Sequence, residues 1–211
     1  MVLPSLNRVL EVEEGVEGLA LFHSSPVAYL LSLIFAVVEA SRGRVLFIDG
    51  FNIANVYLMS KAAEGYGFGE EVLRKVFVSR AFTAYQVLGL LKDLDRHVEE
   101  LNASCVILSE PLRLFLDDDF PRREGLEMAN AAVKELRRVV PKVGRVLAFT
   151  SLSPSMPRRR GVFVKLFEAS SNTVVQVEEG GGVVTLTWVK PAGKTLHLSF
   201  NGETLDSFMG G

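Results

Sequence analysis

Short apolar runs rich in β-branched residues alternate with helical patterns up to about residue 150. Each run fits a strand buried on both faces, which is typical of a parallel sheet. The runs lie at Gly18–Phe22, Arg44–Ile48, Val76–Ser79, Cys105–Leu108 and Val146–Thr150. Because an alternation of strand and helix indicates βαβ crossovers, the chain is predicted to form an α/β fold with a mostly parallel central sheet.

The segments between these strands carry apolar residues at helical spacing. Helices are predicted at Val27–Ala40, Ile53–Ala63, Phe82–Asn102 and Gly125–Val140. The first contains the longest apolar run of the chain, which holds about a dozen residues where a membrane span needs roughly 20. We therefore expect a buried helix there and no membrane partner.

The pattern changes after about residue 150. Three strand-like segments are joined by Gly180–Gly182 and by Pro191–Gly193, which suit the turns of antiparallel hairpins. These segments are Thr173–Val177, Val183–Val189 and Thr195–Phe200. The sheet is thus predicted to be mixed, with antiparallel C-terminal strands, and no linker or repeat divides residues 1–211 into more than one domain.

Composition limits the function classes. The chain has 23 Lys and Arg against 25 Asp and Glu, a net charge of −2, which supplies no global attraction to nucleic acid. The single cysteine, Cys105, lies in an apolar run and is predicted to be a buried, inert thiol. With no sign of an oxidising compartment, we expect a cytoplasmic protein. The scarcity of glutamine beside many Val, Leu, Arg and Glu favours a thermophilic source.

The segment after the first predicted strand has the position of a phosphate-binding loop. It begins His23-Ser24-Ser25-Pro26 and leads directly into the apolar helix. A working loop needs glycines whose N–H groups surround phosphate, and a lysine, and this stretch has neither. We expect Ser24 or Ser25 to cap the helix with Pro26 in its first turn, and His23 to be a polar strand-end residue.

Carboxylates follow two other predicted strands. Asp49, before Gly50, could cap the next helix, bind a metal or act as a base, and its sequence context leaves structural and functional use open. Glu110 could hold Mg²⁺ or orient water, although a solvated strand-end glutamate is the simpler expectation. Asp117–Asp119 is predicted to be an exposed acidic turn, since three consecutive side chains do not converge on one ion.

Two basic segments could contact nucleic acid. Arg122 and Arg123 precede a helix, and Arg158, Arg159 and Arg160 lie in the Ser/Pro-rich segment Ser151–Gly161, which is predicted to be a loop. Adjacent arginines in a loop neutralise phosphates readily, although charge runs are often simply solvated. No Ser-His-Asp order and no zinc-ligand spacing occurs, so neither a hydrolase triad nor a metal site is expected.

The segment Glu71–Gln86 resembles part of archaeal RadA, in which a strand ends in Arg-Ala-Phe and a glutamine follows in the next helix. Further segments resemble parts of the RecA/RadA recombinase core in the same order along the chain. They are Val45–Gly50, Ser104–Ser109, Val146–Ser151, Thr187–Pro191 and Leu196–Phe200. The resemblance covers about residues 15–200 and implies a RecA-like P-loop-NTPase-type three-layer fold.

The chain departs from that family at the nucleotide positions. The Gly-rich Walker A loop with Lys-Thr corresponds to residues 23–30, which lack both features. The catalytic glutamate falls near Phe51, the Walker B aspartate on Ser109, and the Asn-Gln pair on Thr150-Ser151. The resemblance therefore implies a degenerate nucleotide site at His23, Ser24, Ser25, Asp49 and Glu110. Neither a cofactor nor hydrolysis by the family mechanism is expected.

The two DNA-binding loops of the family would correspond to Asp117–Arg123 and Ser151–Gly161, and both contain arginines here. The resemblance implies a non-hydrolysing, core-only paralogue that assists DNA repair or recombination. Its expected partners are DNA, a recombinase or another protein, with self-association left open. Two alternatives stay open: a purely structural pseudo-ATPase subunit that binds no nucleic acid, and an unconventional ATP-dependent enzyme that uses Asp49, Glu110 and Lys190.

Overall fold

One eight-stranded sheet runs through the molecule in the order β3-β2-β4-β5-β1-β6-β7-β8. The computed structural model describes residues 3–116, 122–155 and 158–200. The strands are β1 (Gly18–His23), β2 (Arg44–Asp49), β3 (Val76–Arg80), β4 (Ala103–Ser109), β5 (Arg145–Phe149), β6 (Thr173–Gly180), β7 (Val183–Lys190) and β8 (Ala192–Ser199).

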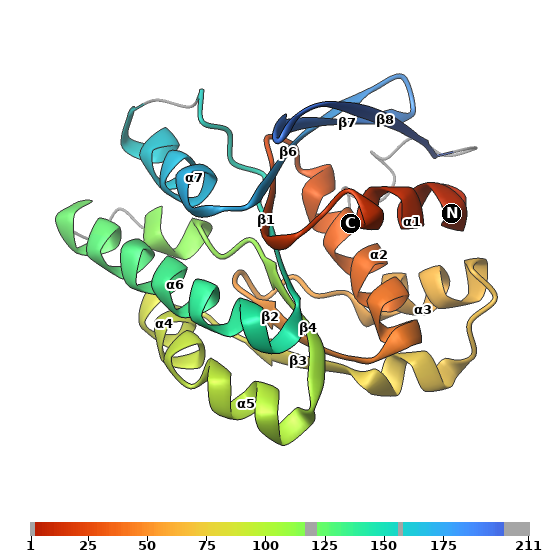
Figure 1. Cartoon of the computed structure of the whole chain (residues 1–211), viewed down its shortest axis with the longest axis horizontal. Helices are drawn as coiled ribbons and strands as arrows, with labels where there is room; N and C mark the ends of the chain where they lie inside the picture. Colours follow the sequence, from red (N-terminus) through yellow and green to blue (C-terminus); the bar gives the residue numbers. More distant parts are fainter. Residues whose placement is uncertain (1–2, 117–121, 156–157, 201–211) are drawn as a thin grey trace.

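The strands from β3 through β6 in this order pair in parallel, whereas β7 is antiparallel to both β6 and β8. The predicted α/β class, with a mostly parallel sheet and antiparallel pairing at the C-terminal end, is confirmed. Together with the helices on both faces, this arrangement is consistent with a RecA-like three-layer fold (Figure 1).

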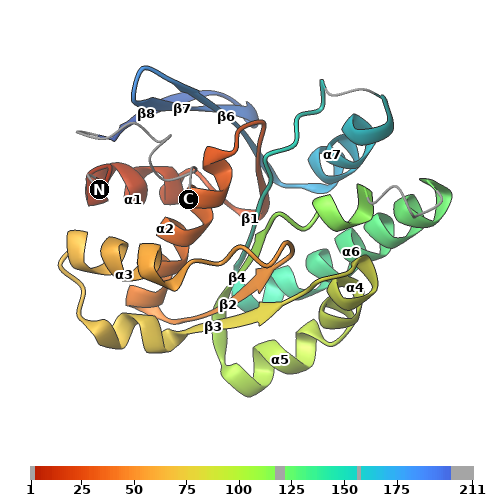
Figure 2. The same ribbon diagram turned by 180° about the vertical axis from the view of Figure 1, so that it is seen from behind.

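Helices form a layer on each face of the sheet (Figures 1 and 2). One face carries α1 (Leu6–Glu14), α2 (Val27–Arg42) and α3 (Val56–Gly65), and the other carries α4 (Ala84–Lys92), α5 (Leu94–Leu101), α6 (Arg122–Val143) and α7 (Arg158–Ser170). Two 3₁₀ segments complete the described helices: η1 (Glu70–Lys75) lies between α3 and β3, and η2 (Arg113–Leu116) lies between β4 and α6. Each layer encloses its own cluster of buried apolar side chains against the sheet.

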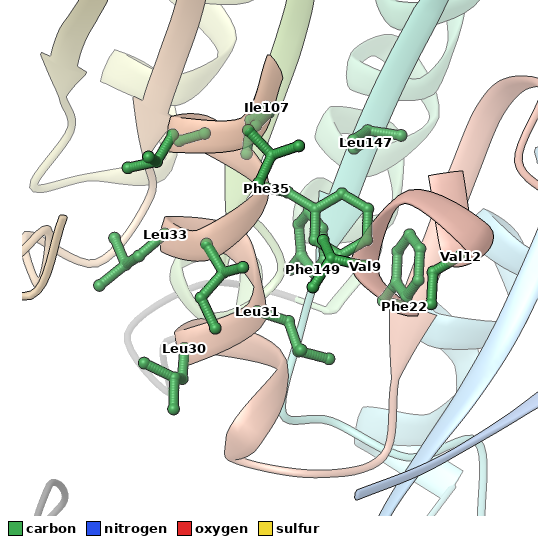
Figure 3. Close-up of a cluster of buried hydrophobic side chains, with 14 of the residues drawn as sticks. Val9, Val12, Phe22, Leu30, Leu31, Leu33, Phe35, Ile107, Leu147 and Phe149 are labelled. Carbon is green, nitrogen blue, oxygen red and sulfur yellow. The ribbon is translucent and has the colours of Figure 1, made fainter. Parts of the chain in front are cut away.

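Helix α2 is the most deeply buried helix of the described chain. Its apolar side chains cover the central strands, and Phe35 contacts Phe22 of β1 and Phe149 of β5 with ring centroids 5.5 and 5.6 Å apart. Figure 3 shows these three rings together, with Val9 of α1 beside them. Burying a side chain of this size contributes about 1.5–3 kcal/mol. Within the described residues, no helix combines the length and the low charge needed to cross a bilayer.

Three features of the predicted elements were wrong. The segment Phe82–Asn102 forms two helices, α4 and α5, because the chain turns at Asp93, which ends the first and precedes the second. Helix α3 begins at Val56 rather than at residue 53, since the Asn55 side chain accepts a hydrogen bond from the Leu58 N–H. Strand β3 is half-exposed rather than buried, because it is an edge strand of the sheet and the helices cover mainly the central strands.

Two helices were not predicted. Helix α1 packs its buried Val9 and Val12 onto the first core cluster, and the Trp188 indole of β7 donates to the Gly15 carbonyl just after it. Helix α7 begins at Arg158, where a loop was expected. Serine and proline before it suggested a loop that ends at Gly161, but the apolar residues Phe163, Val164 and Phe167 anchor the helix in the second cluster.

Two carboxyl groups are buried where α1 meets α2. Glu13 lies 2.7 Å from an Arg42 guanidinium nitrogen, and Glu39 lies 3.1 Å from one of Arg145. Burial and the neighbouring Glu39 raise the pKa of Glu13 to about 7, because they outweigh the attraction of Arg42 and Arg145. Burial likewise raises the pKa of Glu39.

The raised pKa of Glu13 predicts a specific dependence of stability on pH. The folded chain binds the proton of the Glu13 carboxyl more tightly than the unfolded chain does. Protonated Glu13 therefore stabilises the fold fully below about pH 4.5, and this contribution to the unfolding free energy is lost as pH rises through about 7. Replacing Glu13→Gln should remove this loss, so that the variant gains about 2–3 kcal/mol of unfolding free energy relative to the wild type between pH 4.5 and 8. Urea denaturation across this range measures the difference.

Glu14→Gln is the matched control, since Glu14 is the next residue of the same helix and is exposed. Its unfolding free energy should follow that of the wild type at every pH. A Glu13→Gln variant that does the same would contradict the assignment.

Candidate functional site

The carboxyl ends of the parallel strands meet at one edge of the sheet, where open α/β folds place their ligands. Strands β1, β2 and β4 end at His23, Asp49 and Ser109, and Glu110 follows the last of these directly. The structure therefore brings the predicted nucleotide-site residues to a common edge. Their side chains, however, form hydrogen bonds within the fold.

The turn between β1 and α2 uses its own N–H groups. The Ser24 N–H donates to the Leu152 carbonyl at 2.9 Å, and the Ala28 N–H donates to the Ser25 carbonyl at 3.0 Å. Ser25 Oγ accepts from the Val27 N–H at 3.2 Å, but the N-cap position of α2 is occupied by Pro26, which was predicted to lie in the first turn. Ser24 adopts a left-handed backbone with φ of 86°. The turn thus offers a phosphate group few unpaired donors.

His23 is buried at the end of β1. Its Nδ1 lies 2.7 Å from Ser24 Oγ, and its Nε2 lies 3.3 Å from a carboxylate oxygen of Glu168 on α7. Burial lowers the pKa of His23 to about 4, so the imidazole is neutral near pH 7. Glu168 was not among the predicted site residues, because nothing in the sequence connects α7 with β1.

Asp49 orders the loop after β2. The carboxylate is fully buried and accepts from the N–H groups of Phe51, Ile53 and Ala54 at 3.3, 3.1 and 2.7 Å. Arg80 approaches to 3.8 Å. Asn55, rather than Asp49, caps the following helix. With both oxygens engaged by the backbone, Asp49 has a structural role that its sequence context had left open.

Glu110 is buried, so the expectation of a solvated glutamate was wrong. Its two carboxylate oxygens accept from the Ser151 N–H at 2.7 Å and from the Thr150 hydroxyl at 3.2 Å, which ties the end of β4 to the end of β5. Arg113 Nε lies 3.7 Å away. Burial raises the pKa of Glu110. Over the described ranges, no three His, Cys, Asp or Glu side chains gather as a metal site would require.

A cavity of about 630 Å³ opens beside the β1–α2 turn. Its described lining includes Ser24, Ser25 and Pro26 on one side and Gln176, Glu178 and Glu179 of β6 on the other, with two further serines. Among the described residues, this lining holds the carboxylates of Glu178 and Glu179 and neither lysine nor arginine. The β6 residues escaped prediction because only the pairing of β6 with β1 places Gln176 next to His23.

The structure describes the side chain of only one of the five predicted basic residues. Arg123 is largely exposed and lies 3.0 Å from Glu127 one turn along α6. Residues 158–160 begin helix α7 instead of lying in the predicted loop. The side chains of Arg122, Arg158, Arg159 and Arg160 and the acidic segment Asp117–Asp119 lie outside what the structure describes. Cys105 is buried, and burial raises its thiol pKa, as expected of an inert cysteine.

The chain matches no model of a known protein family and no curated protein.

The role of Asp49 can be tested by removing its carboxylate. Asp49→Ala leaves three N–H groups of the β2–α3 loop without an acceptor, and we expect it to lower the unfolding free energy by about 2–4 kcal/mol. The control Glu64→Ala removes an exposed carboxylate that, among the described residues, pairs with Lys61 alone, and it should change the unfolding free energy by less than about 0.5 kcal/mol. Equal stability of the two variants, measured by urea denaturation, would contradict the structural role.

Proposed function

We propose that this chain is a non-hydrolysing RecA/RadA-like protein, an accessory factor in DNA repair or recombination that acts by binding DNA, a partner protein, or both. The observation that carries the proposal is the hydrogen bonding of the candidate residues at the carboxyl edge of the sheet. The described residues that were expected to form a nucleotide site there, which are His23, Ser24, Ser25, Asp49 and Glu110, all form hydrogen bonds within the fold. A RecA-like core that retains its architecture and lacks these groups acts through binding rather than through phosphate chemistry.

The β1–α2 turn supports this proposal. Set against the phosphate-loop pattern G-x-x-x-x-G-K-[ST], residues 23–30 place Tyr29 at the lysine position. The Tyr29 hydroxyl donates to the Ile53 carbonyl and so ties helix α2 to the loop after β2. A neutral phenol that is already hydrogen-bonded cannot supply the positive charge that the lysine gives to the β- and γ-phosphates.

The acidic positions support the same conclusion. The Walker B position carries Ser109, whose hydroxyl lies buried 3.1 Å from that of Ser32 on α2. Asp49 and Glu110 face backbone and hydroxyl donors rather than the cavity beside the turn. Loss of a charged group that stabilises a phosphoryl-transfer transition state costs several kcal/mol, so these changes together favour a chain without ATPase activity.

The position of the arginine segments supports a nucleic-acid partner. Helix α6 begins at Arg122 and α7 begins at Arg158, and the two helices pack against each other. Because each follows a parallel strand, both helices begin on the side of the carboxyl edge. Positive side chains at helix N-termini favour phosphate groups through both charge and helix dipole.

Absence of ATP hydrolysis is the first test. With Mg²⁺ and saturating ATP, the purified wild type should release phosphate no faster than a Glu110→Gln variant prepared identically, which controls for contaminating ATPases. Turnover above that of Glu110→Gln, when the two proteins melt at similar temperatures, would overturn the proposal and favour the unconventional enzyme.

DNA binding is the second test. The Arg158→Ala/Arg159→Ala/Arg160→Ala variant should weaken binding of fluorescent single- or double-stranded oligonucleotides at least about fivefold, with a shallower salt dependence. The control Arg8→Ala/Lys61→Ala/Arg96→Ala removes the same charge from exposed residues that pair with neighbouring carboxylates. Fluorescence anisotropy at several salt concentrations distinguishes the variants. Absence of binding to either DNA form would leave the purely structural subunit as the better account.

A further inference from the structure

A second cavity lies at the opposite edge of the sheet, where β2, β3 and β4 begin. Its volume is about 750 Å³, within the range of small-molecule sites. Its charged lining consists of Arg42, Arg44, Arg74, Lys75 and Lys142. The segment before β3, the start of β3 and helix α5 lie near one another along the lower side of Figure 2.

The cations of this cavity come from distant parts of the chain. Arg42 ends α2, Arg44 begins β2, and Lys142 lies in the last turn of α6. Arg74 and Lys75 end the 3₁₀ segment η1. No aspartate or glutamate belongs to the described lining, in a chain whose net charge is −2. The local excess of positive charge is therefore a product of the fold.

Three of these five cations have no carboxylate partner in the described part of the chain. Arg42 pairs with Glu13, and Lys142 pairs with Asp95 and Glu99 outside the cavity. Arg44 donates to the neutral Leu101 carbonyl at 3.0 Å and so keeps its charge uncompensated. Among the described residues, Arg74 and Lys75 form neither ion pair nor hydrogen bond through their side chains.

Helix C-termini explain only some of these cations. Helices α2, α5 and α6 all end at this edge, and cations are favoured beside the partial negative charge of such ends. Arg44 caps the last carbonyl of α5 in this way, and Lys142 lies in the last turn of α6. Arg74 and Lys75 contact none of these carbonyls and lie on a separate element, so helix capping does not account for them.

The rest of the lining is suited to an organic group. Phe77, Ala103 and Val143 supply apolar surface, and Phe77 is only partly buried. Asn102 and Ser104 add polar groups. Arginine forks bind phosphate oxygens in pairs, and lysine binds them as a point charge, while a partly exposed aromatic ring can stack on a base.

We propose that this cavity binds a nucleoside phosphate, with Arg44, Arg74 and Lys75 holding the phosphate and the apolar wall beside Phe77 contacting the base. The same chemistry is offered by a free nucleotide and by a nucleotide within a single strand of nucleic acid. The inference does not rest on the proposed function, because it concerns the opposite edge of the sheet and requires no hydrolysis.

The test compares three probes on the full chain by isothermal titration calorimetry: ADP, inorganic pyrophosphate and a twelve-residue oligo(dT). At low salt, we expect ADP or oligo(dT) to bind with submillimolar affinity and more tightly than pyrophosphate, because the base adds contacts. ADP binding identifies a free nucleotide as the source, whereas binding of oligo(dT) alone identifies a nucleic-acid strand. Failure of both, or pyrophosphate binding as tightly as ADP, would overturn the assignment.

Substitution locates the site. Arg74→Ala/Lys75→Ala changes two side chains without partners in the described chain and should retain the wild-type melting temperature. It should weaken the bound probe at least about tenfold and, for oligo(dT), reduce the salt slope by about 1.4. The control Lys61→Ala/Arg96→Ala removes the same charge elsewhere and should have no such effect. Binding that survives in Arg74→Ala/Lys75→Ala would overturn the proposal.

Comparing Arg74→Ala/Lys75→Ala with the Arg158→Ala/Arg159→Ala/Arg160→Ala variant separates this inference from the proposed function. If oligo(dT) binding is lost in Arg74→Ala/Lys75→Ala and retained in the Arg158–Arg160 variant, the strand binds at the second cavity. The reverse result places it at the carboxyl edge and contradicts the cavity as the nucleic-acid site.

Discussion

Helix α2 is enclosed on nearly all sides, and the rest of the structure is arranged around it. It packs against the central strands on one side and against α3 and η1 on the other, and its side chains from Val27 to Ala40 are buried with the exception of Tyr29. The ring contacts of Phe35 with Phe22 and Phe149 fix its distance from the sheet. Near its N-terminus, the Tyr29 hydroxyl ties the helix to the loop after β2.

This enclosure has a consequence for the turn that leads into α2. A phosphate loop wraps its N–H groups around an anion, which requires a backbone that does not bond to itself. Here Ser25 closes the first turn of the helix, and Leu152 accepts from the Ser24 N–H. Asp49 and Glu110 tie down the neighbouring loops through backbone and hydroxyl donors. The hydrogen bonds that stabilise this edge are those that a nucleotide would need to replace.

The described linings of the two cavities differ in charge although the chain as a whole is nearly neutral. The described lining at the carboxyl edge carries Glu178 and Glu179, whereas the amino edge carries five cations. The described lining of the cavity at the amino edge therefore favours an anionic ligand. Net charge conceals this difference, because it sums over residues that the fold separates.

Local patterns in the sequence determined the fold class. Alternation of apolar runs with helical spacing identified the parallel strands, and the glycine-rich turns after residue 180 identified the hairpins, because both signals depend only on neighbouring residues. The buried thiol of Cys105 followed from local context in the same way. The missing glycine and lysine in residues 23–30 also needed no structure to be seen.

Only the tertiary structure decided where the polar groups point and which charges meet. That Glu110 is buried depends on the end of β5, which lies 40 residues further along the chain at Thr150. Glu178 reaches the β1–α2 turn only through the pairing of β6 with β1. Arg44, Arg74 and Lys142 converge because the elements carrying them end or begin at one edge of the sheet. Charges interact through space, so a sequence that determines its strands by local pattern does not reveal which side chains will share a cavity.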